Sequence, residues 1–345
     1  MTLPDRVGVL GGGRMGAGIA HAFLMAGARV TVVEREDQVA AAEDRVRAAL
    51  AASVERGQQP GSPDVTVGAD VAAFADCGLV VEAVPEDMDL KIDALARIEA
   101  TVAPGAAIAS NTSSLSIDAL ASHLARPHDF LGLHFFNPVP ASLLVEIVRG
   151  SATADDLAER AREWVTALGK TPVTVNDAPG FASSRLGVAI GLEAIRMLEQ
   201  GVATADDIDL AMTLGYKHPV GPLRLTDLVG LDVRLGIAEY LHAELGDRFE
   251  PPALLRQLVA EGKLGRKTGQ GFFTWENSGP PPPPPSCPAT CRAPGGFRML
   301  RQARRPPSSA MRRPANPSPP SPPRDSTSER RSGTRARSGR PRSAS

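Results

Sequence analysis

The chain has 345 residues, a formal net charge of −1, 42% hydrophobic residues and 31 prolines. That hydrophobic fraction supports a folded core and excludes a wholly disordered protein, and the length allows two ordinary domains. The charge is unevenly divided, because residues 278–345 hold 17 of the prolines and 14 arginines against two acidic residues. The composition therefore indicates an acidic globular body, residues 1–277, followed by a basic, proline-rich tail.

The first half of the chain alternates β-rich runs with helical stretches. A short β-rich run at 6–10 breaks into glycines, a helical stretch follows as far as Gly27, and a second strand ends at Glu34. An amphipathic helix is expected over about 36–56. Further β-rich runs lie at 65–74, 78–84, 106–111, 129–136, 143–150 and 171–177. Strands that alternate with helices at this spacing predict a Rossmann-like, doubly wound, mostly parallel α/β sheet.

The pattern changes after Gly180. Residues 181–264 show helical periodicity and almost no β-rich runs, which predicts an all-helical C-terminal domain. The tail opens with six consecutive prolines and has too few apolar residues to form a core, so it is expected to be disordered. The expected domains are a Rossmann domain over 1–180, a helical domain over 181–277 and a tail over 278–345.

Cysteine usage and apolar runs exclude several classes of protein. No segment reaches about 18 uninterrupted apolar residues, so a membrane span is not expected. The opening residues lack the basic region of a secretory signal. Cys77 is the single cysteine of the body, which leaves neither a disulfide framework nor a metal-ligand cluster there. We therefore expect a cytoplasmic protein without a metal site.

The glycine-rich turn after the first strand predicts a dinucleotide site. Its sequence, GGGRMG at 11–16, fits the G-x-G-x-x-G pattern, in which a pyrophosphate sits at the N-terminus of the following helix. Glu34 ends the second strand, where a carboxylate accepts both ribose hydroxyls and repels a 2′-phosphate, so NAD is preferred over NADP. The residues assigned to the cofactor on this pattern are Gly11, Gly13, Arg14, Met15, Gly16 and Glu34.

Three later segments carry candidate catalytic side chains. Taken singly, Ser113 could cap a helix, His134 could be a structural strand histidine, and Glu146 could be a solvated strand residue. Each closes or follows a strand late in the sheet, however, so all are expected at the carboxyl edge, where ligands bind. A histidine oriented by a carboxylate suits the removal of a hydroxyl proton during hydride transfer.

The sequence resembles the L-3-hydroxyacyl-CoA dehydrogenase family, 3-hydroxybutyryl-CoA dehydrogenase type, over about residues 5–276. The motifs that carry the resemblance are ASNTSSLSI (109–117), GLHFFNPVP (132–140), VEIV (145–148), APGF (178–181), VGPL (220–223) and GRKTGQGFF (265–273). The resemblance implies reversible, NAD-dependent oxidation of an (S)-3-hydroxyacyl-CoA to the 3-ketoacyl-CoA, as in fatty acid metabolism.

The resemblance also implies roles for individual residues. His134 would take the proton of the 3-hydroxyl group, Glu146 would orient the imidazole, and Ser113 would hydrogen-bond the reacting oxygen. Relatives often have Asn where this chain has Ser184, so its contact with the substrate is expected to be longer or water-mediated. Further cofactor contacts are implied at Ser113, Glu86, Lys91, Asn137 and Lys267. The resemblance transfers no coenzyme A contact onto the compact stretch 53–64, where Arg56 is the candidate for a phosphate partner.

Family members dimerise through the second domain, so the resemblance implies a homodimer that takes an acyl-CoA substrate. Two alternatives stay open: a Rossmann dehydrogenase for another hydroxy acid, and a non-catalytic NAD-binding protein with a nucleic-acid-binding tail. The arginines of the tail favour anionic partners, but it has one aromatic residue, Phe297, and no lysine, so nucleic acid is not expected. Its composition is also typical of GC-rich sequence translated in another frame.

Overall fold

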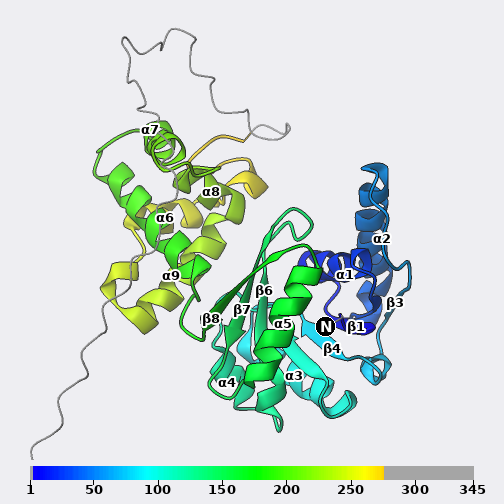
Figure 1. Ribbon diagram of the computed structural model, residues 1–345. Coiled ribbons are helices and arrows are strands. Elements are labelled where there is room, and N and C mark those ends of the chain that lie inside the picture. The colour runs from blue at the N-terminus through cyan, green and yellow to red at the C-terminus, as the bar shows by residue number, and fades with distance from the viewer. Residues whose placement is uncertain (1–2, 276–345) are drawn as a thin grey trace, which may run out of the picture. The chain divides into compact units, whose positions relative to one another are not determined.

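Residues 3–275 are described by the structure, a computed structural model (Figure 1). Strands and helices alternate as far as Asn176, and from Ser183 to Ala260 the regular elements are helices. Within the described residues, no helix is both long and apolar enough to cross a membrane. The prediction of a disordered tail falls on residues 278–345 and lies outside the described part of the chain.

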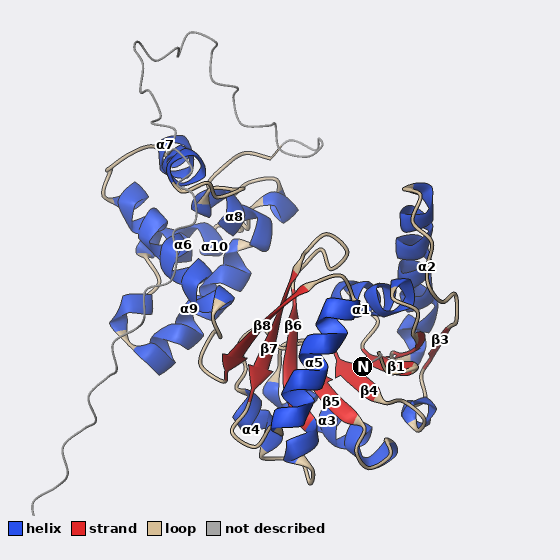
Figure 2. Ribbon diagram, in the orientation of Figure 1, coloured by secondary structure: helices blue, strands red, loops and turns tan. Residues whose placement is uncertain are grey.

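Eight strands form one sheet in the order β3-β2-β1-β4-β5-β6-β7-β8 (Figure 2). They are β1 (Arg6–Leu10), β2 (Arg29–Val33), β3 (Val65–Gly68), β4 (Leu79–Glu82), β5 (Ala107–Ser110), β6 (Phe130–Phe135), β7 (Leu144–Arg149) and β8 (Thr171–Asn176). Neighbouring strands run parallel except β6 and β7, which are antiparallel. The predicted mostly parallel, doubly wound sheet is confirmed. The antiparallel pair arises because only a short connection joins its strands, whereas a parallel pair needs a long crossover.

Helices cover both faces of this sheet. They are α1 (Arg14–Met25), α2 (Val39–Glu55), α3 (Met88–Thr101), α4 (Ile117–Ala121) and α5 (Asp155–Ala167). Strand residues alternate between two cores, as in β4, where Val81 packs with α1, α2 and α5 while Val80 packs with α3 and α4. Because a parallel sheet is buried on both faces, its strands read as nearly continuous apolar runs, which is why the sequence revealed them.

The β-rich run at 65–74 is only partly a strand. Strand β3 ends at Gly68, and residues Val71–Phe74 form a 3-10 turn. The carboxylate of Asp70 accepts a hydrogen bond from the Ala72 backbone N–H at 2.9 Å and so begins this turn. A local side-chain cap therefore overrides the β-like alternation of the sequence.

The second half of the described chain is helical, as predicted. It contains α6 (Ser183–Glu199), α7 (Ala205–Leu210), α8 (Pro222–Val229), α9 (Leu231–Leu245) and α10 (Ala253–Ala260), with a π-helical turn at Ala211–Gly215. Leu192 and Ile195 of α6 are fully buried in a core of their own. The end of the described chain is held by the buried carboxylate of Asp227, which accepts hydrogen bonds from the Phe272 and Phe273 backbone N–H groups.

Candidate active site

His134 and Glu146 face each other directly across the antiparallel strands β6 and β7. Both side chains are buried, and His134 Nδ1 lies 2.8 Å from Glu146 Oε2. A carboxylate only accepts hydrogen bonds, so Nδ1 carries the proton and donates it, and Nε2 keeps its lone pair. The pair therefore presents an imidazole that is oriented to accept a proton at Nε2.

Three further hydrogen bonds hold the Glu146 carboxylate. It accepts from Ser183 Oγ at 2.6 Å, from the Ser183 backbone N–H at 2.8 Å and from the Ala182 backbone N–H at 3.2 Å. Burial by itself raises the pKa of Glu146, but the hydrogen bonds from His134 and Ser183 outweigh burial and hold the pKa below its usual value. Glu146 is therefore ionised at neutral pH, as an orienting anion must be.

Ser183 was not singled out from the sequence, which pointed to its neighbour Ser184. The two residues open helix α6, and their place just after the PGF motif carries no local signal that distinguishes them. Ser184 is partly exposed, and its hydroxyl has no hydrogen-bond partner among residues 3–275. Ser183 thus supports the carboxylate, while the hydroxyl of Ser184 is free for a ligand.

Aromatic side chains surround the histidine. The ring centroids of Phe136 and Phe181 lie 4.3 and 5.7 Å from that of His134. Asn111 Oδ1 accepts a hydrogen bond from the Phe135 backbone N–H at 2.9 Å and so ties the end of β5 to the end of β6. Asn137, the predicted cofactor contact, is exposed two residues after β6. The rings of Phe136 and Phe181 make the surroundings of His134 apolar, which strengthens the electrostatic effect of Glu146 on the imidazole.

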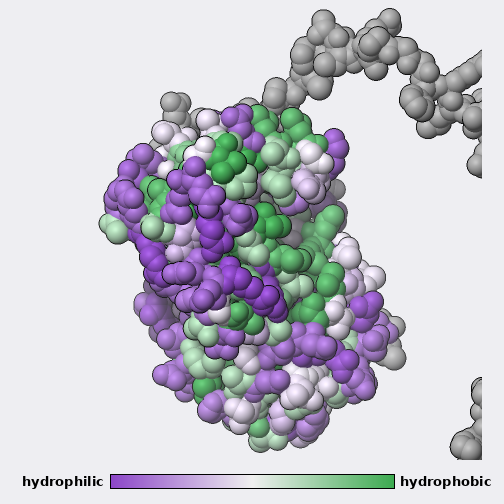
Figure 3. Space-filling model, turned by 90° about the vertical axis from the view of Figure 1, so that its left-hand side faces the viewer, coloured by the Kyte–Doolittle hydropathy of each residue, from purple (hydrophilic) through white to green (hydrophobic). Residues whose placement is uncertain are grey.

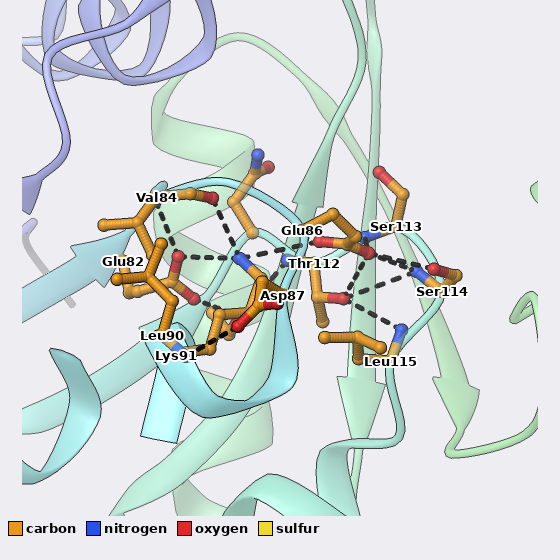
Figure 4. Close-up of polar contacts among 12 residues, drawn as sticks. Glu82, Val84, Glu86, Asp87, Leu90, Lys91, Thr112, Ser113, Ser114 and Leu115 are labelled. Atoms are coloured by element: carbon orange, nitrogen blue, oxygen red, sulfur yellow. Dashed lines mark hydrogen bonds and ion pairs between the residues drawn. The ribbon is translucent and has the colours of Figure 1, made fainter. Parts of the chain in front are cut away.

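Glu86 holds the loop that carries Ser113 (Figure 4). Its Oε1 atom accepts from the backbone N–H groups of Ser113 and Ser114 at 2.9 Å each and from the hydroxyls of Thr112 and Ser114 at 2.7 and 3.0 Å. Burial raises the pKa of Glu86, but Lys91 and these donors outweigh burial and lower it. The Ser113 hydroxyl itself makes no hydrogen bond within the described residues, so the loop presents it to a ligand.

A buried ion pair lies beneath this loop (Figure 4). Lys91 Nζ is 2.7 Å from Glu82 Oε1 and 3.5 Å from Glu86 Oε2, and both Lys91 and Glu82 are almost fully buried. Ser110 Oγ donates to Glu82 Oε2 at 2.6 Å. Burial raises the pKa of Glu82 above its usual value, although the charge of Lys91 acts to lower it. The sequence pointed to Lys91 but not to Glu82, although an acid that ends an apolar strand is a signal that could have found it.

The glycine-rich turn has the geometry that a dinucleotide requires. A Cβ atom at Gly16 would lie 1.7 Å from the Gly11 carbonyl oxygen, so only glycine allows the helix to pack on the strand there. A Cβ at Gly13, by contrast, would meet nothing within 4 Å, which leaves open space at the N-terminus of α1. Internal packing does not require glycine at Gly13, so its place is explained by a ligand that approaches the backbone, such as a pyrophosphate.

Glu34 lies beside this turn and fits the ribose of the cofactor. Its Oε2 atom accepts a hydrogen bond from the Gly12 backbone N–H at 2.9 Å, at the end of β2. Arg14 and Met15 open α1, where Arg14 is exposed and Met15 is partly buried. The residues present therefore fit NAD, because a carboxylate at this position can accept ribose hydroxyls.

Lys267, the predicted basic contact from the second domain, has a partner in this structure. It lies in the 3-10 turn Arg266–Thr268, and its Nζ is 2.6 Å from each carboxylate oxygen of Asp232. Its contact with the cofactor stays a prediction.

Comparison with known proteins gives a consistent result. The family model of the 3-hydroxyacyl-CoA dehydrogenase NAD binding domain matches residues 6–178, and that of the C-terminal domain matches residues 180–275. A 3-hydroxybutyryl-CoA dehydrogenase of Mycobacterium tuberculosis is 43% identical over 281 residues, which cover 79% of this chain and 98% of that protein. Human mitochondrial hydroxyacyl-coenzyme A dehydrogenase is 37% identical over 285 residues, which cover 78% and 91% of the two chains.

The fold comparison agrees with the sequence comparison. A crystal structure of (S)-3-hydroxybutyryl-CoA dehydrogenase from Ralstonia eutropha matches with a TM-score of 0.76 and 37% identity, covering 80% of this chain and 100% of that one. Both halves of the described chain, the sheet with its NAD-binding turn and the helices after it, are thereby accounted for. The chain belongs to the 3-hydroxyacyl-CoA dehydrogenase family.

Proposed function

We propose that this protein oxidises (S)-3-hydroxybutyryl-CoA and related 3-hydroxyacyl-CoA thioesters reversibly to the 3-ketoacyl-CoA, with His134 as the general base. The observation that carries the proposal is the buried pair of His134 and Glu146, which leaves Nε2 as a fixed proton acceptor. NAD, when bound, accepts the hydride that leaves C3 of the substrate. Such an enzyme serves fatty acid metabolism and, with the buried free thiol of Cys77, suits the reducing cytoplasm.

The residues of the chain move the proton. As the hydride leaves C3, His134 Nε2 takes the proton of the 3-hydroxyl group, and Glu146 stabilises the imidazolium that forms. The Ser113 hydroxyl donates a hydrogen bond to the same oxygen while it becomes a carbonyl, and Glu86 keeps the loop of Ser113 in place. In the reverse direction the imidazolium returns its proton to that oxygen, so one pair of residues serves both directions.

A basic cavity beside the segment that follows β6 suits the phosphates of coenzyme A. The cavity has a volume of about 570 Å³ and is lined by Arg56, Lys170 and His21, next to Pro138 and Pro140. Burial and the positive charges of Arg56 and Lys170 lower the pKa of His21, which reports a positive potential in the cavity. We assign this cavity to the coenzyme A part of the substrate.

Exposed apolar side chains favour a homodimer. The exposed large apolar residues of the helical part include Leu186 (63%), Leu214 (55%), Tyr216 (76%), Leu225 (40%) and Val233 (46%). Hydrophobic residues are exposed beside strongly hydrophilic ones on the face drawn in Figure 3. Apolar side chains at this exposure are typical of a subunit interface. Sedimentation should give a dimer that Leu186→Arg dissociates, and a wild-type monomer at micromolar concentration would contradict the assignment.

The catalytic proposal is tested by following NADH formation from (S)-3-hydroxybutyryl-CoA. Wild type should turn over, and His134→Ala should lose activity by roughly the 10²–10⁴-fold that general base catalysis contributes. The same assay with free 3-hydroxybutyrate separates this function from that of a dehydrogenase for free hydroxy acids, which would prefer the free acid. Full activity of His134→Ala would disprove the base assignment, and an inactive wild type would disprove the function.

The coenzyme A assignment is tested by Arg56→Gln. The variant should raise KM for acetoacetyl-CoA and leave kcat nearly unchanged, because phosphate binding is remote from C3. Acetoacetyl-pantetheine lacks the nucleotide phosphates, so its KM should not respond to the variant. An equal rise of KM for both thioesters would show that Arg56 acts on the fold instead of on the phosphates.

A further inference from the structure

A buried arginine of the helical part has no partner among the residues that the structure describes. Arg234, on α9, is 5% exposed, and its side chain makes no hydrogen bond or ion pair with any residue from 3 to 275. Its Nε atom is shielded from solvent and unpaired. Burial lowers the pKa of Arg234 to about 10, so the guanidinium is still protonated at neutral pH. No carboxylate of residues 3–275 pairs with it, so its charge is uncompensated within the described part of the chain. A buried, uncompensated cation is costly, which indicates that an anion binds there.

The guanidinium points toward the end of α6 that carries the active site. A Cβ atom at Gly191 would lie 3.8 Å from Nε, whereas one at Gly187 would lie 3.8 Å from Nη1. The side chain of Arg234 thus runs past Gly191 toward Gly187, one turn closer to the start of α6. At that start, Ser183 binds the Glu146 carboxylate. Ser183 and Gly187 are four residues apart and share one face of the helix, about 6 Å along its axis.

Two glycines of α6 make room for this guanidinium. Larger side chains at Gly187 and Gly191 would fill the space that Arg234 now occupies or faces. Gly187 is partly exposed and Gly191 is buried, so the Nη1 end lies nearer to solvent than Nε does. Arg234 thus lies against Gly187 and Gly191 of α6, the helix whose first residue, Ser183, binds Glu146.

From this geometry we infer that Arg234 binds a carboxylate at the far end of the acyl chain, so that the preferred substrates are 3-hydroxyacyl-CoA thioesters of dicarboxylic acids. The planar guanidinium matches a carboxylate with two parallel hydrogen bonds. The phosphates of coenzyme A are assigned to the cavity at Arg56, which leaves the acyl end as the source of the anion. The inference rests on the proposed function, because it takes C3 of the substrate to lie beside His134.

The length of the chain follows from the helix. From Ser183 to the stretch between Gly187 and Gly191 is about 6–12 Å along α6. A carboxylate separated from C3 by a few methylene groups spans this distance, so acyl chains of roughly six to ten carbons are the candidates. A methyl-ended chain of the same length would leave Arg234 unpaired and would bury its own end against a charge.

The test compares carboxylate-ended with methyl-ended 3-hydroxyacyl-CoA substrates of equal length at six, eight and ten carbons. For wild type, kcat/KM should be at least about tenfold higher for the carboxylate-ended substrate at one or more of these lengths. Arg234→Met should lower kcat/KM for the carboxylate-ended substrate at least about tenfold more than for its methyl-ended counterpart. The control Arg97→Met, which removes an exposed arginine of α3, should leave the ratio as in wild type.

Gly187→Leu provides an independent variant that keeps the arginine. The leucine should block access to Nη1 and remove the preference, even if Arg234→Met does not fold. Equal kcat/KM values for wild type at all three lengths would overturn the inference, as would equal losses for both substrate types in both variants. If Arg234→Met dissociated the dimer but left the ratio of kcat/KM for carboxylate-ended to methyl-ended substrates unchanged, the inference would also be overturned. The anion would then belong to a second copy of the chain.

The outcomes also separate this inference from the proposed function. A wild type that oxidises methyl-ended substrates without preference overturns the carboxylate site and leaves the dehydrogenase intact. A wild type that oxidises no 3-hydroxyacyl-CoA overturns both.

Discussion

The role of Glu146 is tested most directly by Glu146→Gln, which removes the charge and keeps the shape. The carboxylate is 1% exposed and lies next to the imidazole that becomes positively charged in the reaction. Two unit charges about 4 Å apart attract by about 4 kcal/mol at an effective dielectric constant of about 20. Since 1.36 kcal/mol corresponds to a tenfold change in rate, losing this attraction should lower kcat roughly a thousandfold.

Hydrogen bonding adds to this loss, because an amide cannot replace the carboxylate at this position. Oε1 accepts from the backbone N–H groups of Ala182 and Ser183, and Oε2 accepts from His134 and the Ser183 hydroxyl. In either orientation of the substituted side chain, the NH₂ group of the amide faces an N–H donor. The variant therefore leaves at least one buried donor unpaired, in the imidazole or in the start of α6.

The assay is NADH formation from (S)-3-hydroxybutyryl-CoA under single-turnover and steady-state conditions. KM for NAD should change little, because Glu146 is remote from the glycine-rich turn. Ser183→Ala is the matched control, since it removes one hydrogen bond of about 1 kcal/mol and keeps the charge, so kcat should fall only about fivefold. If Glu146→Gln retained kcat within a few-fold of wild type while folding normally, the electrostatic reasoning would be refuted.

Three other predictions concern the cofactor turn, the buried ion pair and the buried thiol. Gly13→Ala should fold normally but raise KM for NAD, because its Cβ would enter the open space that we assign to the pyrophosphate. Gly16→Ala should destabilise the fold, because its Cβ would lie 1.7 Å from a carbonyl oxygen. Thermal unfolding and NAD titration compare the two variants, and equal stability would contradict the argument. Lys91→Met should lower the unfolding free energy by about 3–5 kcal/mol in denaturant titration, because Glu82 would stay buried without its cationic partner. A loss below about 1 kcal/mol, which is the contribution of one ordinary hydrogen bond, would contradict a buried charge pair. Cys77 should react with a thiol reagent only after unfolding, because burial shields it and raises its pKa from 9.0 to about 11. The unfolded chain loses the thiol proton first, so the unfolding free energy should fall as pH rises from about 9 to about 11. Peptide mapping of labelled native protein checks this, and rapid native labelling at Cys77 would oppose it.

Much of the fold could be predicted because it depends on local patterns. Apolar runs bounded by glycines mark the buried parallel strands, and the change to helical periodicity after Gly180 marks the helical part. The strand expected over 65–74 was partly wrong because Asp70 caps a turn there. The antiparallel direction of β7 was not predicted, since period and composition do not report which way a strand runs.

Some residues of the candidate site could likewise be predicted from the sequence, and others could not. His134 and Glu146 were identified as partners from motifs, and the register of β6 and β7 places them opposite each other. Ser183 and Glu82 were missed because each acts through a contact with a residue distant in the chain, Ser183 with Glu146 and Glu82 with Lys91. No spacing rule links such residues, because their separation in sequence is set by the topology of the sheet and not by the period of a helix or strand.

The sequence by itself determined the class of fold, the glycine-rich turn with Glu34 and the residue types that the chemistry needs, because these depend on local backbone geometry. Only the tertiary structure decided which side chains hold one another. It placed Ser183 on the Glu146 carboxylate, Glu86 on the loop of Ser113, and Arg234 against the glycines of α6 with no partner among residues 3–275. Burial is the reason: a charge costs little in water wherever it lies in the sequence, and its need for a partner arises only when packing removes the water.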